Sequence, residues 1–344
     1  MDNLYDKIYG ALFGAALGDA FGRPTEFMNY REIERFSPES FVNVYRFPLL
    51  KVTDDTQMSI AVADALMDAY AVDKAILPLT FEKQLRKHFV SWLHDPQNNR
   101  APGMTCLGAC ENLARGVAWE MATRKNSKGC GANMRVLPAG LMKFKKGTAF
   151  TDKDVAKWAQ FQSAMTHAHP TALAAAELTA MALVKLIEGI DPESLLSFLL
   201  EYGETQMQVY HEDFLQTVWE RPMMESPTEF IQMGWQENLA ALRKVETAYL
   251  QYDGESDPCV WTGAGWIAEE ALATGLFCFL LYPDNFPKVI ERAVRTSGDS
   301  DSIACLAGGF AGAYLGVDAI PVEWLDNLEY RDDLEAFGEF LEAS

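Results

Sequence analysis

The sequence has few basic residues for its size. Of its 344 residues, 29 are Lys or Arg and 49 are Asp or Glu, so the formal net charge at neutral pH is −20. Proteins that bind nucleic acid unaided need a basic surface that neutralises phosphates. This charge balance therefore predicts that nucleic acid is not a partner.

Long apolar runs are also absent. No stretch reaches the roughly 20 residues that a helix needs to span a bilayer. The first residues lack the basic segment, apolar segment and cleavage site of a secretory signal. We therefore expect a protein with no membrane partner and a cytoplasmic location.

Cysteine is scarce and shows no paired spacing. The six cysteines include no C-x-x-C pair, and Cys106 and Cys110 are simply one helical turn apart. This spacing disfavours a disulfide framework or a zinc site. We expect free, buried thiols, as is usual in a reducing cytosol.

Linkers and internal repeats are missing too. No Ser-, Gly- or Pro-rich segment divides the chain, and no period of about 20 to 50 residues recurs, which disfavours a solenoid. Although the length alone would allow about two domains, we predict one domain over residues 1–344.

What the sequence does contain is helical periodicity. Apolar residues recur three or four positions apart in stretches that begin near Leu4, Leu173 and Ala271, whereas the segment 41–47 alternates in the manner of a strand. Hydrophobic residues make up 49% of the chain, enough for a sizeable core. The sequence therefore predicts an all-α fold.

Two glycine stripes predict a close contact between two of these helices. Gly10, Gly14 and Gly18 are four residues apart, and so are Gly308, Gly312 and Gly316. A glycine inside a helix costs about 1 kcal/mol relative to alanine. We expect close approach of the two helix backbones to compensate for that cost, and the two helices to form the central scaffold.

Residues typical of helix starts mark several boundaries. Pro170 stands where a first helical residue is expected, and Asp191 precedes another such proline. Thr53 can cap the helix that follows it, and Ser300 or Asp301 can cap a later helix in the same way.

The most informative feature is a pair of runs of oxygen-bearing side chains, residues 52–56 and 297–302. Each run alone could be an ordinary N-cap that complements the helix dipole. Brought together, their four aspartates would repel one another unless a cation compensates them. An all-oxygen ligand set suits Mg²⁺ or Mn²⁺, so the runs predict a two-metal site.

Segments along nearly the whole chain match one known family in sequence order. They are residues 10–20 with Glu26, residues 53–56, residues 129–135, Thr166 with His167, and residues 297–302 followed by Gly308 and Gly309. On these segments the chain resembles the ADP-ribosylglycohydrolase family. The resemblance implies a single compact orthogonal multi-helix bundle and a hydrolase that acts on N- or O-glycosyl bonds.

The resemblance also implies two Mg²⁺ or Mn²⁺ ions and assigns their ligands. These ligands are Thr53, Asp54, Asp55, Asp299, Asp301 and Ser302. Ser302 stands where threonine is usual and keeps the ligating hydroxyl. Hydrolysis at a glycosidic carbon requires a carboxylate and a positioned nucleophile; Glu26 and Asp55 are the two candidates for proton transfer, and the sequence leaves open which one acts.

Substrate binding is implied at a glycine-rich loop and a histidine. The residues are Gly129, Cys130, Gly131, Met134, Arg135 and His167. Glycines let the backbone approach the diphosphate, and Cys130 stands where asparagine is common. Arg135 is either a phosphate ligand or a structural ion-pair residue, and Trp261 or Trp266 either stacks on adenine or is a buried aromatic.

These expectations leave more than one function open. The first is hydrolysis of the bond between ADP-ribose and a protein side chain, with arginine as the expected acceptor. Within the same chemistry, O-linked conjugates or ADP-ribosylated small molecules are alternatives. A different class is an immunity protein that blocks a cognate ADP-ribosyltransferase by binding it, its acidic surface meeting a basic toxin.

Overall fold

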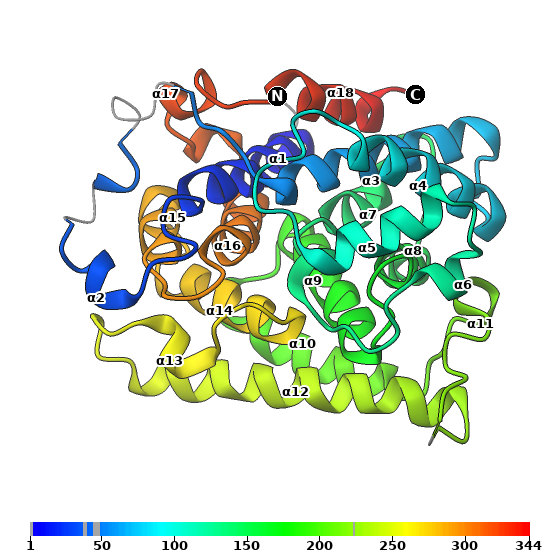
Figure 1. Ribbon diagram of the computed structural model, residues 1–344. Helices are drawn as coiled ribbons and strands as arrows, with labels where there is room; N and C mark the ends of the chain where they lie inside the picture. The colour runs from blue at the N-terminus through cyan, green and yellow to red at the C-terminus, as the bar shows by residue number, and fades with distance from the viewer. Residues whose placement is uncertain (1–2, 37–39, 44–48, 223) are drawn as a thin grey trace.

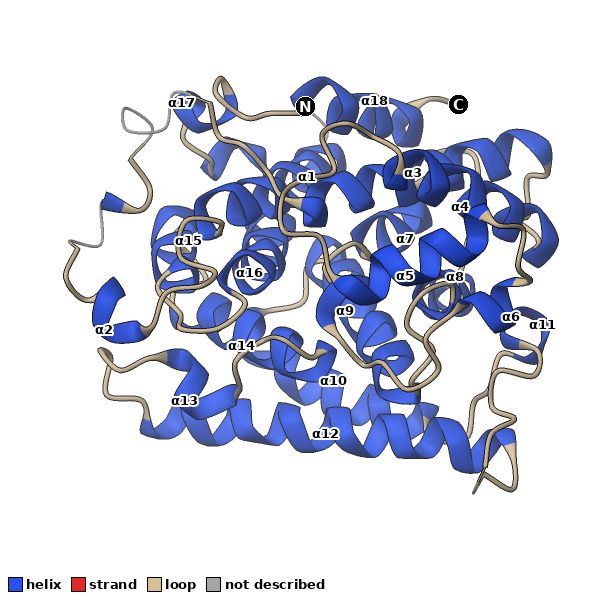
Figure 2. Cartoon of the chain, viewed as in Figure 1, coloured by secondary structure: helices blue, strands red, loops and turns tan. Residues whose placement is uncertain are grey.

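A computed structural model describes residues 3–36, 40–43, 49–222 and 224–344. Within these ranges no residue forms a strand, and three isolated β-bridges are present. The helices drawn in Figures 1 and 2 therefore confirm the predicted all-α fold. Of the alternating segment 41–47, residues 44–47 lie outside the described ranges, and residues 41–43 form a turn rather than a strand.

The helices follow one another in this order: α1 (Asn3–Gly22), α2 (Tyr30–Ile33), α3 (Asp54–Val72), α4 (Pro78–Leu93), α5 (Met104–Ala114), α6 (Trp119–Ala122), η2 (Cys130–Ala132), α7 (Leu137–Leu141), η3 (Met142–Phe144), α8 (Asp152–Ala164), α9 (Pro170–Glu188), α10 (Pro192–Gln206), α11 (Glu212–Leu215), α12 (Pro227–Gln251), α13 (Pro258–Thr262), α14 (Ala268–Leu281), α15 (Phe286–Val294), α16 (Ser300–Leu315), η4 (Val317–Ala319), α17 (Val322–Leu325) and α18 (Arg331–Glu342).

Helices α1 and α16 pack in backbone contact, as the glycine stripes predicted. A Cβ on Gly14 would lie 2.2 Å from the carbonyl oxygen of Gly308, and one on Gly10 would lie 2.4 Å from that of Gly312. No side chain fits at such distances. Because Gly10 faces Gly312 and Gly18 faces Ala304, the two helices run antiparallel.

The last glycine of the predicted stripe on α16 lies at the end of the helix rather than inside it. Gly316 is the C-cap of α16, with φ +85°; a Cβ there would meet the Asp6 side chain, and a Cβ on Gly10 would lie 2.7 Å from the Gly316 carbonyl carbon. Gly22 extends the stripe on α1, because its Cβ would lie 2.5 Å from the Ser300 carbonyl oxygen. The end of α1 therefore meets the start of α16.

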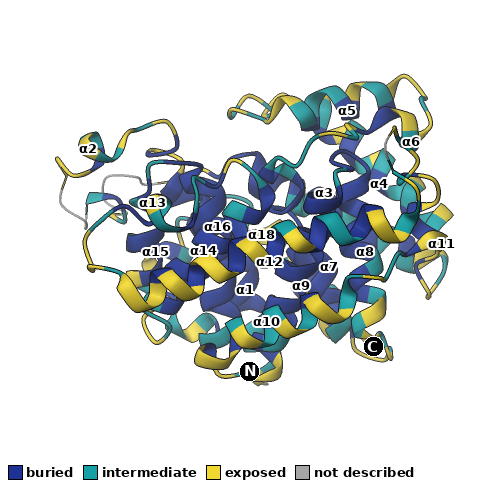
Figure 3. Ribbon diagram, turned by 90° about the horizontal axis from the view of Figure 1, so that it is seen from below, coloured by how far each residue is buried: buried dark blue, intermediate teal, exposed yellow. Residues whose placement is uncertain are grey.

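Helix α9 occupies the centre of the core. It is long and apolar enough to cross a membrane by length and composition, but 94% of its most apolar window is buried inside the protein. Figure 3 shows α9 and α16 in the dark blue of buried residues, with exposed faces on the outer helices. Such burial is typical of the core helix of a globular protein.

Around this centre, α12 packs along α9 and α14, while α18 lies against α1 and α3 (Figure 1). The predicted starts at Pro170 and Asp191 are confirmed, because α9 begins at Pro170 and the Asp191 side chain caps α10. These contacts bring both ends of the chain onto one scaffold.

Candidate active site

One cleft of about 380 Å³ collects most of the predicted site residues. Its acidic side consists of Glu26 from the loop after α1, Asp54 and Asp55 from the first turn of α3, and Asp299 and Asp301 from the start of α16. Its other predicted lining residues are Gly129, Cys130, Gly131, Met134, His167 and Ser302. Thr53 and Arg135 do not line it.

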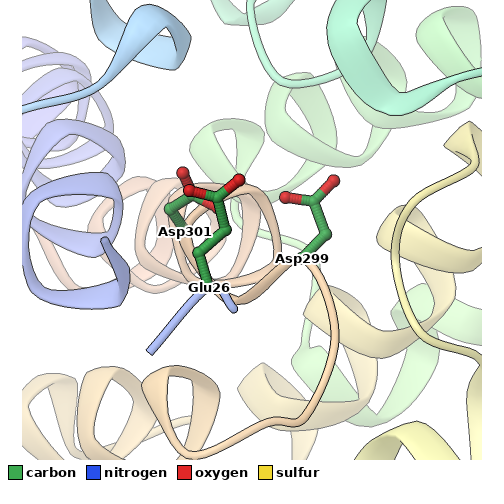
Figure 4. A group of neighbouring side chains, drawn as sticks. All are labelled: Glu26, Asp299 and Asp301. Atoms are coloured by element: carbon green, nitrogen blue, oxygen red, sulfur yellow. The ribbon is translucent and has the colours of Figure 1, made fainter. Parts of the chain in front are cut away.

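Three of the acidic side chains form a compact cluster. Carboxylate oxygens of Glu26, Asp299 and Asp301 lie within 4.8 Å of one another, which suits a shared metal ion. Figure 4 shows their carboxylates pointing to the same side, Glu26 from the loop after α1 and the two aspartates from the start of α16. The antiparallel packing of α1 and α16 is what brings these two segments together.

Asp19 fixes the first turn of α3 from inside the scaffold. Its carboxylate accepts hydrogen bonds from the Thr53 N–H at 2.9 and 3.0 Å and from the Thr56 N–H at 3.1 Å and hydroxyl at 2.5 Å. Thr53 is the N-cap, as predicted, and accepts from the Asp55 N–H. The carboxylates of Asp54 and Asp55 are therefore left to face the cleft.

The start of α16 differs from the prediction. Its N-cap is Asp299, which makes no side-chain cap bond, and neither Ser300 nor Asp301 is the cap. The Ser300 hydroxyl instead donates to the Gly22 carbonyl oxygen at 3.0 Å, because α1 ends there. The Asp299 and Asp301 carboxylates consequently take part in the acidic cluster.

Burial raises the pKa of every carboxyl group on the acidic side of the cleft and of Asp19 behind it, and for all of them except Asp301 itself the charge of Asp301 adds to the effect. The pKa of Glu26 rises to about 9 through burial and the charges of Asp301 and Asp54. For Asp54 it rises to about 8, and for Asp19 to about 7, in both cases through burial and then Asp301. Burial and Asp301 also raise the pKa of Asp55 and of Asp299.

The donor set fits divalent cations that prefer oxygen. The Asp55 Oδ2 atom is buried and has no hydrogen-bond partner among the described residues, although an unpaired buried carboxylate oxygen is costly. Carboxylates with hydroxyls nearby are the ligands that Mg²⁺ and Mn²⁺ take. A cation at this place would compensate the repulsion that raises these pKa values.

The loop 129–131 forms another part of the cleft wall, and the charges of Asp299 and Asp55 act on the Cys130 thiol. Its Cys130 N–H donates to the Trp266 carbonyl oxygen at 3.1 Å, so this amide is not offered to the cleft. A Cβ on Gly131 would lie 2.7 Å from the Cys106 sulfur, which explains the glycine. Met134 lines the cleft behind this loop.

His167 lies beneath the same loop as a neutral imidazole. Burial and the neighbouring Arg135 lower its pKa to about 3. The Thr166 hydroxyl lies 2.8 Å from the His167 Nδ1 atom and accepts a hydrogen bond from Arg135. Arg135 and Nδ1 are the two hydrogen-bond partners of that hydroxyl among the described residues, so the tautomer that lets the hydroxyl give its proton to Nδ1 is the one with the ring proton on Nε2.

Arg135 stands behind the cleft wall. Its fully buried guanidinium donates to the side-chain and backbone oxygens of Gln162, each at 2.8 Å, and lies 4.5 Å from the centre of the Phe89 ring. No carboxylate is among these partners, so the structural ion pair, one of the two alternatives for Arg135, is not formed among the described residues, and Arg135 does not line the cleft. Arg135 instead orients Thr166 and through it His167.

The two tryptophans of the segment 261–266 have different surroundings. Trp266 lines the cleft, is 45% exposed and stacks on the Phe27 ring with centres 6.1 Å apart. Trp261 donates to the Ser256 hydroxyl at 2.9 Å and packs edge-on against Tyr252, away from the cleft.

Sequence reasoning assigned no role to several residues of the cleft region. Asp19, an acidic residue within the apolar, glycine-striped run of α1, belongs to the matched segment 10–20 but was given no role. Phe27 gave a weaker signal as a large apolar residue beside Glu26. Ala101, Pro102 and Met104 line the cleft from the α4–α5 connection, and no chemical pattern marks them.

Comparison with known proteins gives one consistent result. A family model described as ADP-ribosylglycohydrolase matches residues 1–344. The human ADP-ribosylhydrolase ARH3 is 26% identical over 316 residues, with 86% of this chain and 79% of the relative covered. The ADP-ribosyl-[dinitrogen reductase] glycohydrolase of Rhodospirillum rubrum is 25% identical over 338 residues, with 97% and 94% covered.

A solved structure shares the fold. It is described as an ADP-ribosylglycohydrolase-related protein complex, and it superposes with a TM-score of 0.70 at 23% identity, over 99% of this chain and 98% of the other.

Proposed function

Because the chain belongs to the ADP-ribosylglycohydrolase family, we propose that it hydrolyses the glycosidic bond between ADP-ribose and an arginine side chain of a modified protein. The observation that carries the proposal is the cleft in which five carboxylates face a glycine-containing loop. The match to the Rhodospirillum glycohydrolase over 97% of the chain supports a protein substrate.

Charge supports arginine as the acceptor. Two divalent cations supply four positive charges, which balance Asp54, Asp55, Asp299 and Asp301 while Glu26 keeps its proton. The described lining of the cleft holds no Lys or Arg and its His167 is neutral, so no positive side chain there repels a guanidinium, and carboxylates pair with guanidinium in a well-defined geometry. O-linked conjugates and ADP-ribosylated small molecules are the alternatives within the same chemistry.

The cations are proposed to be two Mg²⁺ or Mn²⁺ ions. Their ligands would come from Asp54, Asp55, Asp299, Asp301 and Ser302, with the Thr53 hydroxyl at the edge of the set. When bound, they would supply Lewis-acid stabilisation for the ribose hydroxyls and an attacking water.

Glu26 is proposed to perform the proton transfer. It lies on a loop rather than in a helix turn, and burial is the largest cause that raises its pKa, so its carboxyl group holds a proton more readily than an exposed one even where cations compensate the charges of Asp301 and Asp54. In this role it donates that proton to the departing nitrogen. Asp55 is then assigned to cation binding, since its buried Oδ2 atom lacks another partner.

The other residues of the cleft bind and orient the substrate. The Nε2–H of His167 is a donor for a substrate oxygen, and the loop 129–131 gives the diphosphate a surface of small residues. Arg135 holds the His167 ring through Thr166. The barrier is lowered mainly by positioning of the substrate and by charge stabilisation.

A comparison of substrates and one variant tests this proposal. We expect purified protein with Mg²⁺ to release ADP-ribose from arginine-linked peptides faster than from serine- or cysteine-linked peptides. Glu26→Gln should lower the rate by about 100-fold or more, because it removes the ionisable group while keeping its shape. Release is measured by chromatography.

The matched control is Glu34→Gln, because Glu34 is an exposed glutamate at the C-terminal end of α2. It should retain the wild-type rate. Equal release from Glu26→Gln and wild type would contradict the assigned role, and the absence of release from every conjugate would overturn the hydrolase proposal and leave direct binding of a transferase as the alternative.

We also propose a reducing compartment such as the cytoplasm. The support is that all six cysteines are free thiols, five of them buried.

A further inference from the structure

The connection between α13 and α14, residues 263–267, touches three of the segments that form the cleft. The connection itself is tied down by α14, because the Ala264 N–H donates to the Glu270 side chain at 2.9 Å and the Thr274 hydroxyl donates to the Gly263 carbonyl oxygen at 2.8 Å.

Its first contact is with the start of α16. The Asp299 N–H donates to the Ala264 carbonyl oxygen at 2.8 Å. A Cβ on Gly298 would lie 1.8 Å from that same oxygen, and one on Gly265 would lie 3.2 Å from the Asp299 Cβ. Gly265 also has φ +83°, a conformation that favours glycine. The position of Asp299 is therefore set by this connection.

Its second contact is with the loop 129–131. The Trp266 carbonyl oxygen accepts from the Cys130 N–H at 3.1 Å, and the neighbouring Ala268 N–H donates to the Lys128 carbonyl oxygen at 2.9 Å. Gly129 and Ile267 form an antiparallel bridge. Residues 128–130 and 266–268 are thereby held side by side in the wall of the cleft.

Its third contact is with the loop that carries Glu26. The Trp266 ring stacks on the Phe27 ring at an interplanar angle of 20°. Phe27 is 73% exposed and follows Glu26 directly. Its stacking on Trp266 therefore holds the chain on the C-terminal side of Glu26. On the other side, Thr25 is buried and donates to the Val294 carbonyl oxygen at 2.7 Å.

We propose that the 263–267 connection is a positioning brace for the active site, in which Trp266 acts through Phe27 to hold Glu26 against the cleft. Glu26 is thus fixed between a buried hydrogen-bonded residue and a surface aromatic pair. The kinetic consequences of this proposal rest on the hydrolase function proposed above. The packing of the loop that carries Glu26 can be measured whether or not the protein is a hydrolase.

The kinetic test uses Trp266→Ala, Phe27→Ala, the double variant and Trp266→Phe. Each alanine variant should lower kcat by about tenfold to a hundredfold, because a catalytic group misplaced by about 1 Å costs this much. KM should change much less. The double variant should be no slower than the slower single variant, and Trp266→Phe should restore most of kcat because it keeps the stacked ring.

Additive losses in the double variant, or a rise in KM with unchanged kcat, would overturn the brace and indicate that Trp266 contacts the substrate directly. The matched control is Trp261→Ala, which removes an indole from the same segment but away from Phe27. Its kcat, measured below its melting temperature, should stay near that of wild type.

A second readout does not depend on catalysis. Hydrogen exchange should quicken in Trp266→Ala at residues 25–28, where the Met28 N–H donates to the Thr25 carbonyl oxygen, and should not quicken in α12. If wild type hydrolyses no conjugate, the proposed function fails while this measurement still decides on the brace. Unchanged exchange at residues 25–28 would refute the brace even in an active enzyme.

Discussion

At the scale of single residues, two fully buried carboxyl groups lie outside the lining of the cleft. Asp19 lies within the apolar interior of α1 and organises the first turn of α3, while Glu177 lies in the middle of α9 and does not line the cleft. Both are fully buried, and burial raises the pKa of each to about 7.

Replacing Asp19 tests its organising role. In Asp19→Asn one acceptor oxygen becomes a donor that faces the N–H groups of Thr53 and Thr56. We expect the free energy of unfolding in urea to fall by about 1–3 kcal/mol, and ADP-ribose release to fall with it. Asp73→Asn, which alters a surface bond to the Leu77 N–H, is the control, and an equal effect there would argue against a special role for Asp19.

Glu177 predicts how stability depends on pH. Its carboxylate accepts from the Tyr202 hydroxyl at 2.6 Å and the Gln160 amide at 2.5 Å, but burial outweighs these bonds and raises its pKa from 4.5 to about 7. Because the folded state holds this proton more tightly than the unfolded state, stability is lost as pH rises through that interval.

At about 1.4 kcal/mol per pKa unit, Glu177 should cost about 2 to 3 kcal/mol between pH 5 and pH 8. Urea unfolding of wild type and Glu177→Gln, both with saturating Mg²⁺, measures this difference. Glu204→Gln, an exposed neighbour, should follow wild type. Identical pH profiles for wild type and Glu177→Gln would show that the pKa of Glu177 is not raised.

At the scale of elements, the packing of α1 against α16 positions both halves of the acidic cluster. A Cβ on Gly14 would lie 2.2 Å from the Gly308 carbonyl oxygen and one on Gly308 would lie 2.1 Å from the Gly14 carbonyl oxygen, both too short for a non-bonded contact. Any relief requires the two helices to move apart, and such a movement would separate Glu26 from Asp299 and Asp301.

Gly14→Ala and Gly308→Ala should therefore each destabilise the protein by at least about 3 kcal/mol, as measured by thermal unfolding. Gly108→Ala on α5 is the control, because its Cβ meets only the flexible end of the Arg124 side chain. Better helix propensity should make that variant neutral or more stable by up to about 1 kcal/mol. Equal melting temperatures for all three variants would contradict backbone contact.

At the scale of the whole molecule, a group of buried carboxyl groups lies where segments far apart in the sequence converge. A net charge of −20 already opposes folding through self-repulsion, and the cluster of Glu26, Asp299 and Asp301 adds buried carboxylates to it. Cations bound at the cleft should therefore stabilise the folded chain as a whole.

We expect Mg²⁺ or Mn²⁺ to raise the melting temperature and EDTA to lower it. At a hundredfold excess over the dissociation constant, binding to the native state alone contributes about 2.7 kcal/mol. NaCl at the same ionic strength is the control for general screening, and Asp299→Asn should lose most of the Mg²⁺ effect. A melting temperature that is the same in Mg²⁺ and in NaCl would count against the site.

The sequence by itself determined the all-α fold, the contact between the glycine-striped helices and the residue types of the acidic cleft. It could do so because helical periodicity and glycine spacing are local patterns. Two runs that each pair aspartates with a hydroxyl are, in addition, typical of few kinds of site, of which a divalent-cation site is one. The assignment of one domain to residues 1–344 stays a prediction.

Only the tertiary structure decided which side chains face the cleft. Arg135 lies behind the wall because its guanidinium has partners from α8 and Thr166, and the cap of α16 is Asp299 because Ser300 bonds to the end of α1. Asp19 acts on a helix start more than 30 residues away. Such outcomes depend on which distant segments meet, and a local pattern carries no record of that.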